Sequence, residues 1–485
     1  MNNIIDLNEP IAITGLGCYF PGAPNPKKYW ENIYNNKCQI RHLTNNEREL
    51  GPVYDPKQNT WNKTQTCLGA LIEPFEFPYK RFKGLPPSAI HASDPNFKWG
   101  LLAAQDAIDD AGLTNQTDKN IYVVLAGNAY STPLLRDYSD SYLFYQLDEL
   151  KQTKTFQLLS ITEQKIFLEK LNKEYFKIQK KLSVDSLIAS MASHLAARIT
   201  KLNGFTGGHT AVDAACASSF AAIDLAIKRL RAHAINIAVV GGVGEIIPFF
   251  YIYCSNAKTL SNEGSFPFDT KASGFVVGEG AGFIVLKRLS QALKENDKIH
   301  AIIRGIGASS DGSKTAPWAP SKEGQKLAVL RALKQVPYNI CDLQYIECHG
   351  TGTRVGDLEE ILGIRDLLSK NKTSIAIGSA KGAIGHLLTG AGFAGLFRTI
   401  LAIQNKTLPP TAGLTSIIEE LKKSDLFIPR TPLEWKLPPS QFTRKAMVNS
   451  FGFGGTNYNI QLEEFNYNHH KNYPEELPAR KNIKL

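Results

Sequence analysis

Apolar strand-like segments alternate with helix-like segments along nearly the whole chain, and this alternation most restricts the fold. Runs of consecutive apolar residues at 11–16, 120–128 and 235–243 are typical of buried strands. Segments with helical periodicity lie between them, at 98–112 and 212–231. Apolar strands connected by helices form a mostly parallel sheet that is covered by helices. We therefore predict an α/β fold.

The second half of the chain repeats this alternation. Its predicted elements are strands at 298–310, 343–350 and 374–382, helices at 322–336, 357–368 and 392–404, and a strand hairpin at 445–464. Two successive α/β units without an obvious linker indicate a duplicated core in one body. We predict two halves, 1–295 and 296–466, followed by a loose polar tail at 467–485.

Residues 141–182 differ in character and predict a helical insertion lying on the body of the protein. Ser160 and Glu163 have the spacing of a capping box. Apolar residues then follow one helix face, with lysines and glutamates on the other. A surface decoration and a partner-binding arm both fit this pattern.

Glycines follow the first predicted strand, in GLGCYFPG at 15–22. A dinucleotide-binding GxGxxG motif would need its third glycine at Phe20, so that interpretation is weak. We favour a tight strand-to-loop turn instead.

Composition and charge exclude several classes. The 485 residues are 43% hydrophobic, enough for a large core. Seven cysteines are widely spread without a CxxC pair, which indicates free thiols in a reducing cytoplasm and no cysteine metal site. The N-terminus lacks the regions of a signal peptide.

The longest apolar stretch, 235–253, is interrupted by Glu245 and Pro248, so we expect no membrane span. The net charge of +10 favours an acidic partner. No basic run interleaved with aromatic residues supports nucleic-acid binding, and we expect none.

Four loops carry reactive or glycine-rich residues at strand or helix ends. They are DAACASS with Cys216, ECHGTGTRVGD with His349, GSAKGAIGHLLTGAG with Lys381 and His386, and NSFGFGGTN around Phe453. We place Cys216 in the first turn of a helix, where the dipole favours thiolate; a buried structural cysteine is the alternative. Each loop is a weak signal alone. One cysteine and two histidines at strand ends of an α/β sheet are a stronger one.

These four loops, in this order and spacing, resemble the β-ketoacyl synthases (ketosynthases) of the thiolase superfamily. The segments 266–289 and 309–325 are similar to those of iterative polyketide and polyunsaturated fatty-acid synthases. The resemblance covers the chain from Ile11 to about Glu464. It implies a thiolase-like, five-layered αβαβα fold of two related halves, usually a homodimer, with the site between the halves.

The resemblance also implies roles for individual residues. Cys216 matches the nucleophile that accepts an acyl chain as a thioester. His349 and His386 match the pair that polarises the malonyl thioester carbonyl and supports decarboxylation. Lys381 matches a structural lysine and Glu360 its acidic partner.

The remaining carried-over residues surround the substrate. The backbone N–H groups of Cys216 and Phe453 would form an oxyanion hole, with Gly452 and Gly454 flanking Phe453 as a gate. Thr351 and Thr353 match threonines that hydrogen-bond the pantetheine arm.

The implied function is decarboxylative Claisen condensation in polyketide or fatty-acid biosynthesis, an acyltransferase reaction. We expect no metal and no tightly bound cofactor, because substrates arrive on the phosphopantetheine arm of an acyl carrier protein. No carrier domain follows in the sequence, so we expect that protein to act in trans. Two alternatives are a non-catalytic chain-length partner subunit, which usually lacks the cysteine, and a thiolase using coenzyme A.

Two positions depart from the family pattern. Gly382-Ala383 stand where Ser-Asn is usual, and Asn459 where histidine is frequent. We expect both to affect packing or loop order more than activity.

Overall fold

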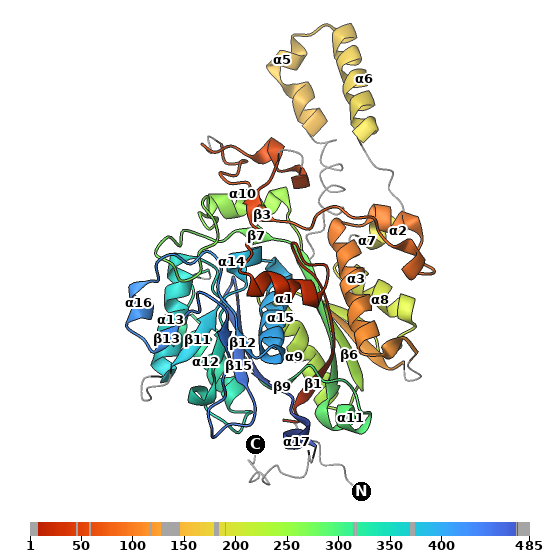
Figure 1. The fold of residues 1–485 in the computed structure, drawn as a ribbon. Coiled ribbons are helices and arrows are strands. Elements are labelled where there is room, and N and C mark those ends of the chain that lie inside the picture. Colours follow the sequence, from red (N-terminus) through yellow and green to blue (C-terminus); the bar gives the residue numbers. More distant parts are fainter. Residues whose placement is uncertain are drawn as a thin grey trace.

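One mixed sheet runs through the computed structural model, which describes residues 8–44, 47–57, 60–115, 119–127, 146–178, 184–189, 191–313, 316, 318–368, 374–471 and 473 (Figure 1). Over these residues the strand order is β13-β11-β10-β15-β16-β9-β1-β8-β6-β4-β5. The N-terminal strands are β1 (Ile11–Tyr19), β4 (Ile121–Ala126), β5 (His209–Val212), β6 (Ile237–Gly244) and β8 (Gly280–Arg288). The C-terminal strands are β9 (Ala301–Ser310), β10 (Tyr345–Glu347), β11 (Ile375–Gly378), β13 (Leu426–Phe427), β15 (Lys445–Gly452) and β16 (Thr456–Glu463). The predicted α/β fold is confirmed, but the prediction of a mostly parallel sheet is wrong. Five of the ten neighbouring strand pairs are antiparallel, because β8 and β16 return beside their neighbours in the opposite direction.

Two groups of strands in this sheet share one topology. Counted along the chain, each group lies in the spatial order third, second, fourth, fifth, first: β5-β4-β6-β8-β1 and β11-β10-β15-β16-β9. In both groups the second strand is parallel to the third and fourth, and the remaining pairs are antiparallel. The groups meet where Ile11–Ile13 of β1 pair with Ala301–Ile303 of β9. The chain therefore contains two related halves, joined at a central seam.

Helices and sheet halves alternate in layers. The helices α3 (Pro95–Asp110) and α8 (His194–Asn203) pack on the outer face of the N-terminal half. The helices α9 (Ser218–Arg231) and α15 (Ala391–Gln404) lie between the halves, within the largest hydrophobic cluster. The helices α12 (Lys322–Leu333) and α13 (Arg354–Leu368) cover the C-terminal half. This is the expected five-layered αβαβα arrangement.

Shorter elements complete the body. The helices are α1 (Pro26–Tyr34), α2 (Pro87–Ala92), α7 (Val184–Ala189), α10 (Pro248–Asn256), α11 (Leu289–Lys294), α14 (Lys381–Ile384) and α16 (Glu419–Lys422). Two small sheets are β2 (Arg41–His42) with β3 (Leu68–Ala70) and β7 (Val277–Gly278), and β12 (Thr407–Leu408) with β14 (Leu433–Glu434).

Glycines on β1 and β9 lie where a helix contacts a strand directly. A Cβ on Gly17 would lie 2.0 Å from a backbone oxygen of α3, and a Cβ on Gly307 would lie 2.0 Å from a backbone oxygen of α12. Gly15 and Gly305 are similarly close to these helices. The strand β1 continues through both of its glycines to Tyr19, three residues beyond the predicted end. The predicted tight turn follows it, where Phe20 and Ala23 exchange two backbone hydrogen bonds of 2.8 Å. The glycines permit close helix packing.

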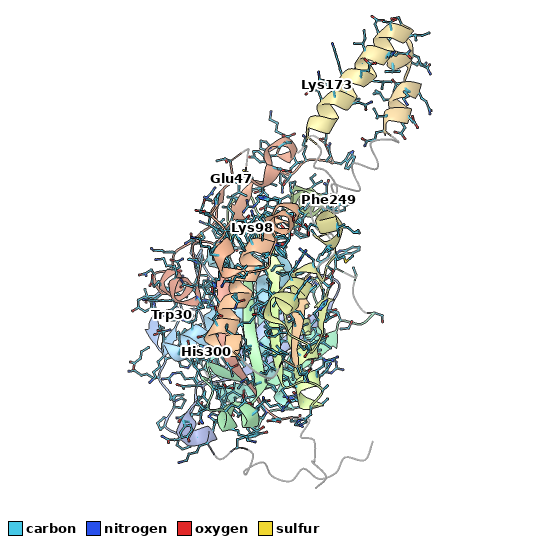
Figure 2. All side chains as sticks on the ribbon, turned by 90° about the vertical axis from the view of Figure 1, so that its right-hand side faces the viewer. Trp30, Glu47, Lys98, Lys173, Phe249 and His300 are labelled. Atoms are coloured by element: carbon cyan, nitrogen blue, oxygen red, sulfur yellow. The ribbon has the colours of Figure 1, made fainter. Side chains whose placement is uncertain are left out.

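The predicted insertion is helical where it is described. The helices α5 (Lys154–Gln157) and α6 (Ile161–Ile178) project from the body instead of lying on it, and Lys173 of α6 is far from Lys98 of α3 (Figures 1 and 2). The capping box is confirmed, since Ser160 N donates to Glu163 Oε2 at 2.8 Å and Glu163 N donates to Ser160 Oγ at 3.3 Å. Residues 141–145 and 179–182 lie outside the described residues.

The C-terminal segment begins differently from the loose tail expected at 467–485. Residues Tyr467–His470 form a helical turn, α17, and His470 is buried. Residues 474–485 lie outside the described residues.

The apolar stretch at 235–253 divides into the buried strand β6 and the start of α10. The described part of the chain contains no helix with the length and apolar character that a membrane span requires.

Candidate active site

A cavity of about 660 Å³ lies where loops from both halves meet. The loop before α9, the loop after β10, and the turn between β15 and β16 all contribute to it. Eight of the residues singled out in the sequence line it: Cys216, His349, Thr351, Thr353, Glu360, His386, Gly452 and Phe453. Lys381 and Gly454 are not among its lining residues. The structure thus brings the cysteine, both histidines and both threonines to one space.

Cys216 lies in a tight turn between β5 and α9. Ala215 has φ of 51°, a left-handed conformation that is unusual for a residue with a Cβ. Ser218 Oγ accepts from Ala214 N at 2.8 Å and donates to Ala215 O at 2.6 Å, which holds the turn. Because α9 begins at Ser218, Cys216 precedes the helix, and the prediction that it lies in the first turn is wrong.

The pKa of Cys216 is raised, contrary to the expected thiolate. Burial raises the pKa of the thiol, while the backbone N–H of Phe453, the charge of Lys381 and the backbone N–H of Cys216 itself oppose this rise. Burial dominates because a buried thiolate loses its hydration. The backbone N–H groups of Phe453 and Cys216, which lie near the Cys216 sulfur, are the pair that the family resemblance assigns to an oxyanion hole.

The backbone around His386 determines which ring nitrogen carries the proton. Its main chain bridges β7, with His386 N donating to Val276 O at 2.7 Å. Its Nδ1 accepts from Leu388 N at 3.0 Å, so a neutral ring carries its proton on Nε2. Burial, with a contribution from the charge of Lys381, lowers the pKa of His386 to about 3. At neutral pH His386 is therefore an uncharged Nε2–H donor.

His349 has the same arrangement. Its Nδ1 accepts from Phe451 N at 3.4 Å, which again leaves the proton on Nε2. Burial, followed by the charges of Lys381 and His386, lowers the pKa of His349 well below its usual range. The two imidazole rings lie with centroids 5.7 Å apart at an interplanar angle of 84°. The cavity therefore contains two neutral N–H donors.

Lys381 and Glu360 both bind the backbone of His349. Lys381 Nζ donates to His349 O at 2.6 Å, and Glu360 accepts from His349 N at 2.8 Å and from Gly350 N at 2.9 Å. Both side chains are buried. No ion pair joins Lys381 and Glu360 directly within the described residues. The predicted acidic partner of Lys381 is therefore connected to it only through the backbone of His349. The charged side chains of Lys381 and Glu360 thus hold the loop at His349, one at its carbonyl and the other at its N–H.

Asn449 is a functional residue that the sequence did not single out. It donates to Glu360 Oε1 at 2.8 Å, and Asn459 donates in turn to Asn449 Oδ1 at 2.7 Å. Asn459, one of the departures from the family pattern, is thus two hydrogen bonds from the carboxylate that holds His349. Only the pairing of β15 with β16, which places these asparagines opposite each other, reveals the connection.

Close backbone contacts explain the other glycine positions. A Cβ on Gly452 would lie 2.6 Å from Ala214 O, which brings the Phe453 loop against the Cys216 turn. A Cβ on Gly382 would lie 2.3 Å from Ala412 O. Glycine at this position, where serine is usual in the family, therefore fits the close contact with the backbone of Ala412.

Phe453 is an exposed residue of the cavity lining, whereas Thr351 is buried and Thr353 is half-buried. The side chain of Phe453 is 63% exposed. The Thr351 and Thr353 hydroxyl oxygens are 2.9 Å apart.

The layered fold and the cavity between its halves define a thiolase-like protein, and solved ketosynthase structures share this fold. The family model for the β-ketoacyl synthase N-terminal domain matches residues 8–292, and the model for the C-terminal domain matches residues 300–415. The chain belongs to the β-ketoacyl synthase family.

Relatives with this similarity are much larger proteins. The chain is 30% identical to a polyunsaturated fatty acid synthase protein of Thraustochytrium sp. over 96% of its own length and 17% of that protein. It is also 30% identical to a phenolphthiocerol/phthiocerol polyketide synthase protein of Mycobacterium tuberculosis, over 95% of its own length and 24% of that protein. The chain thus spans about a fifth of the length of these curated relatives.

Solved structures give the same assignment. The ketosynthase from module 6 of the bacillaene synthase of Bacillus subtilis matches with a TM-score of 0.76 and 29% identity, covering 94% of this chain and 72% of that one. The PfaC keto synthase–chain length factor matches with a TM-score of 0.79 and 28% identity, covering 94% of this chain and 48% of that one.

Proposed function

We propose that this chain is a β-ketoacyl-[acyl-carrier-protein] synthase that catalyses decarboxylative Claisen condensation in polyketide or fatty-acid biosynthesis. The observation that carries the proposal is the cavity that brings Cys216 together with two neutral Nε2–H donors, His349 and His386. A condensing enzyme needs a nucleophile that also leaves well, and donors for two developing oxyanions.

In the first half-reaction, Cys216 Sγ attacks the carbonyl carbon of an acyl-pantetheine thioester. The oxyanion accepts hydrogen bonds from the backbone N–H groups of Cys216 and Phe453. Collapse of the intermediate breaks the bond to the pantetheine sulfur, which takes up the proton that Cys216 gives up. No proton is gained or lost overall. Because the pKa of Cys216 is raised, its thiol gives up the proton as the sulfur attacks and does not wait as a thiolate.

In the second half-reaction, a malonyl thioester occupies the emptied cavity, with its carbonyl oxygen accepting from Nε2–H of His349 and His386. Loss of carbon dioxide leaves an enolate on that oxygen, and its carbon attacks the Cys216 thioester. The new carbon–carbon bond gives a tetrahedral intermediate at the thioester carbon. Its collapse breaks the bond to Cys216 Sγ, and the departing thiolate takes up a proton from solvent. Lys381 and Glu360 are positioning residues here, since both bind the backbone of His349.

Substrates would arrive on the phosphopantetheine arm of a carrier protein, with Thr351 and Thr353 hydrogen-bonding the arm inside the cavity. We also propose that the carrier acts in trans and that the chain forms a homodimer. The strand β5 supports the dimer, since it is the edge of the sheet in the described residues and is only partly buried. An edge strand offers unpaired backbone groups to a second copy.

A non-catalytic chain-length partner is the second candidate, because one structural relative contains a chain-length factor. Such a partner needs neither the nucleophile nor the donors. The presence of Cys216, His349 and His386 in one cavity therefore favours catalysis.

Loading and condensation can be tested separately. Incubation with an acyl-pantetheine or acyl-carrier donor, followed by intact-mass and peptide mass spectrometry, should place the acyl group on Cys216, and Cys216→Ala should abolish it. His349→Asn and His386→Asn should reduce carbon–carbon bond formation by about 100-fold or more while loading survives at least in part. His91→Asn, at an exposed position on α2, is the matched control. Acyl loading that persists in Cys216→Ala would refute the assignment.

A further inference from the structure

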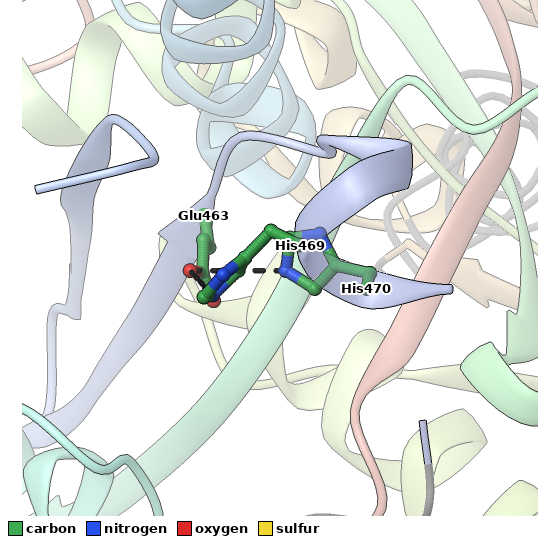
Figure 3. A group of neighbouring side chains, drawn as sticks. All are labelled: Glu463, His469 and His470. Atoms are coloured by element: carbon green, nitrogen blue, oxygen red, sulfur yellow. Dashed lines mark ion pairs between the residues drawn. The ribbon is translucent and has the colours of Figure 1, made fainter. Parts of the chain in front are cut away.

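A carboxylate and two imidazoles converge at the end of β16, far from the cavity. Glu463 ends β16, and His469 and His470 come from α17, which folds back toward it (Figure 3). The Nε2 atoms of His470 and His469 lie 3.8 and 4.0 Å from Glu463 Oε1. The three ligand atoms all lie within 4.8 Å of one another. We call these three residues the Glu463 cluster.

His470 presents a buried lone pair to this cluster. Its side chain is 5% exposed and stacks on Phe465 with centroids 5.6 Å apart. Its Nδ1 lies 2.8 Å from Asn466 O and 3.2 Å from Asn466 N; the shorter contact, with the carbonyl, requires the proton on Nδ1. In that tautomer the Nε2 atom is unprotonated, and it is buried and without a hydrogen-bond partner among the described residues. An imidazole whose other nitrogen donates to a carbonyl has the usual orientation of a metal ligand.

Glu463 is ionised and held in place by its other contacts. Its Oε1 accepts from Thr443 Oγ1 at 2.6 Å, and its Oε2 pairs with Arg304 Nε at 3.1 Å. A carboxylate oxygen has two lone pairs, so Oε1 can bind a further partner besides Thr443.

The cations around the site are engaged with other groups. Arg304 pairs with Glu463 itself, and Arg444 pairs with Glu464 at 2.8 Å. Lys445 lies over the ring of Tyr338, 5.5 Å from its centroid. A divalent cation would therefore be repelled less than the number of nearby arginines and lysines suggests, because these side chains interact with other groups.

We propose that the Glu463 cluster binds a divalent transition metal ion of the zinc class, with water in the fourth position. Imidazole and carboxylate are ligands that zinc prefers. The distances of 3.8 and 4.0 Å from the two Nε2 atoms to Glu463 Oε1 are too long for hydrogen bonds. In a tetrahedral zinc site with metal–ligand bonds of about 2.0–2.1 Å, two ligand atoms lie about 3.4 Å apart. Each imidazole must therefore close on Glu463 by about 0.5 Å. His469, which is 45% exposed, leaves a solvent side for the ion and its water.

Such an ion would fix α17 to β16 and would not take part in condensation. The strand β16 runs eight residues from the turn at the cavity to Glu463, about 23 Å at about 3.3 Å per residue. The site is thus a structural one, and its loss should leave acyl loading unchanged.

Zinc binding to the metal-free chain tests the proposal. Calorimetric titration should show one zinc ion per chain and a higher melting temperature with zinc. Because the thiol and imidazoles of the cavity also attract zinc, the titration is repeated in Cys216→Ala, where the same stoichiometry should persist. Cobalt as a probe should give the visible absorption of a tetrahedral nitrogen and oxygen site.

Ligand variants decide the location. His469→Ala, at an exposed position that cannot disturb the core, should weaken zinc binding by about 100-fold or more, as should His470→Ala. His91→Ala should bind like the parent chain. Absence of zinc binding would mean that the cluster is only an imidazole–carboxylate contact, and binding unchanged in His469→Ala would place the ion elsewhere. Either result overturns the proposal.

Discussion

The lowered pKa of His386 makes a quantitative prediction about stability and pH. His386 has a pKa of about 3 in the folded chain, against an ordinary value of 6.5. Between these values the unfolded chain binds a proton that the folded chain does not, so stability falls as the pH falls below 6.5. The loss is about 1.4 kcal/mol per pH unit in this window. From pH 7.5 to pH 5.0, His386 should therefore cost the folded chain about 2 kcal/mol.

His386→Asn removes this term with little other change. The Oδ1 atom of asparagine can accept the hydrogen bond from Leu388 N that Nδ1 accepts now, but asparagine cannot take up a proton. The variant should therefore lose about 2 kcal/mol less than the parent chain over the same pH interval. The charge of His386 also contributes to the lowered pKa of His349, but burial and Lys381 are the larger causes and remain in the variant.

Urea denaturation of the parent chain and of the variant at pH 7.5 and pH 5.0 gives the free energy of unfolding at each pH. The pH-dependent change in this free energy is then compared between the two proteins. His91→Asn, exposed on α2, controls for the loss of a histidine as such and should behave as the parent does. If His386→Asn shows the same pH dependence as the parent chain, His386 is not held neutral by burial. The proposed role of its Nε2–H as an uncharged donor would then fail.

Two further predictions concern the loop around His349 and the carrier partner. Lys381→Met should lower the free energy of unfolding by about 2–3 kcal/mol and reduce condensation more than loading, because His349 O loses a charged donor; an unchanged melting temperature would contradict this. With a net charge of +10, loading from an acidic carrier protein should slow as salt rises, since exposed attraction is screened beyond about 10 Å at 0.1 M salt. Loading from a small uncharged acyl-pantetheine should change little, and equal salt dependence of both donors would remove the role of charge.

Much of the fold could be predicted because its signal is local. Consecutive apolar residues in β4 and β6 indicate buried strands without knowledge of their partners. Gly15 and Gly17 show where this stops. Glycine commonly ends strands, and only the helix packed on β1 explains why the strand continues through them. The pairing of β1 with β9, across about 290 residues, likewise has no local signature.

The candidate site was predicted unevenly. Cys216, His349 and His386 lie in recognisable loops, and the structure brings them to one cavity. The sign of the Cys216 pKa shift was wrong, because the sequence indicates a nearby helix but not how deeply the thiol is buried. Asn449 was missed because its partner Glu360 lies 89 residues away in the chain.

The Glu463 cluster was missed for a similar reason. Two adjacent histidines in a polar segment ordinarily face solvent. Only the fold of α17 against β16 buries His470 next to a carboxylate.

The hydrogen bonds and burial of His349 and His386 determine which proton each ring carries, and this matters for the proposed function. A backbone N–H binds Nδ1 of each ring, from Leu388 for His386 and from Phe451 for His349. Each contact fixes the proton on Nε2, and burial with the nearby charge of Lys381 prevents a second proton from binding. A protonated imidazole would donate more strongly, but it would also attract the malonyl carboxylate that has to leave as carbon dioxide. In the proposed condensation, two neutral donors would avoid that attraction and still stabilise the enolate. The loss of stability at low pH would be the measurable consequence of keeping them neutral.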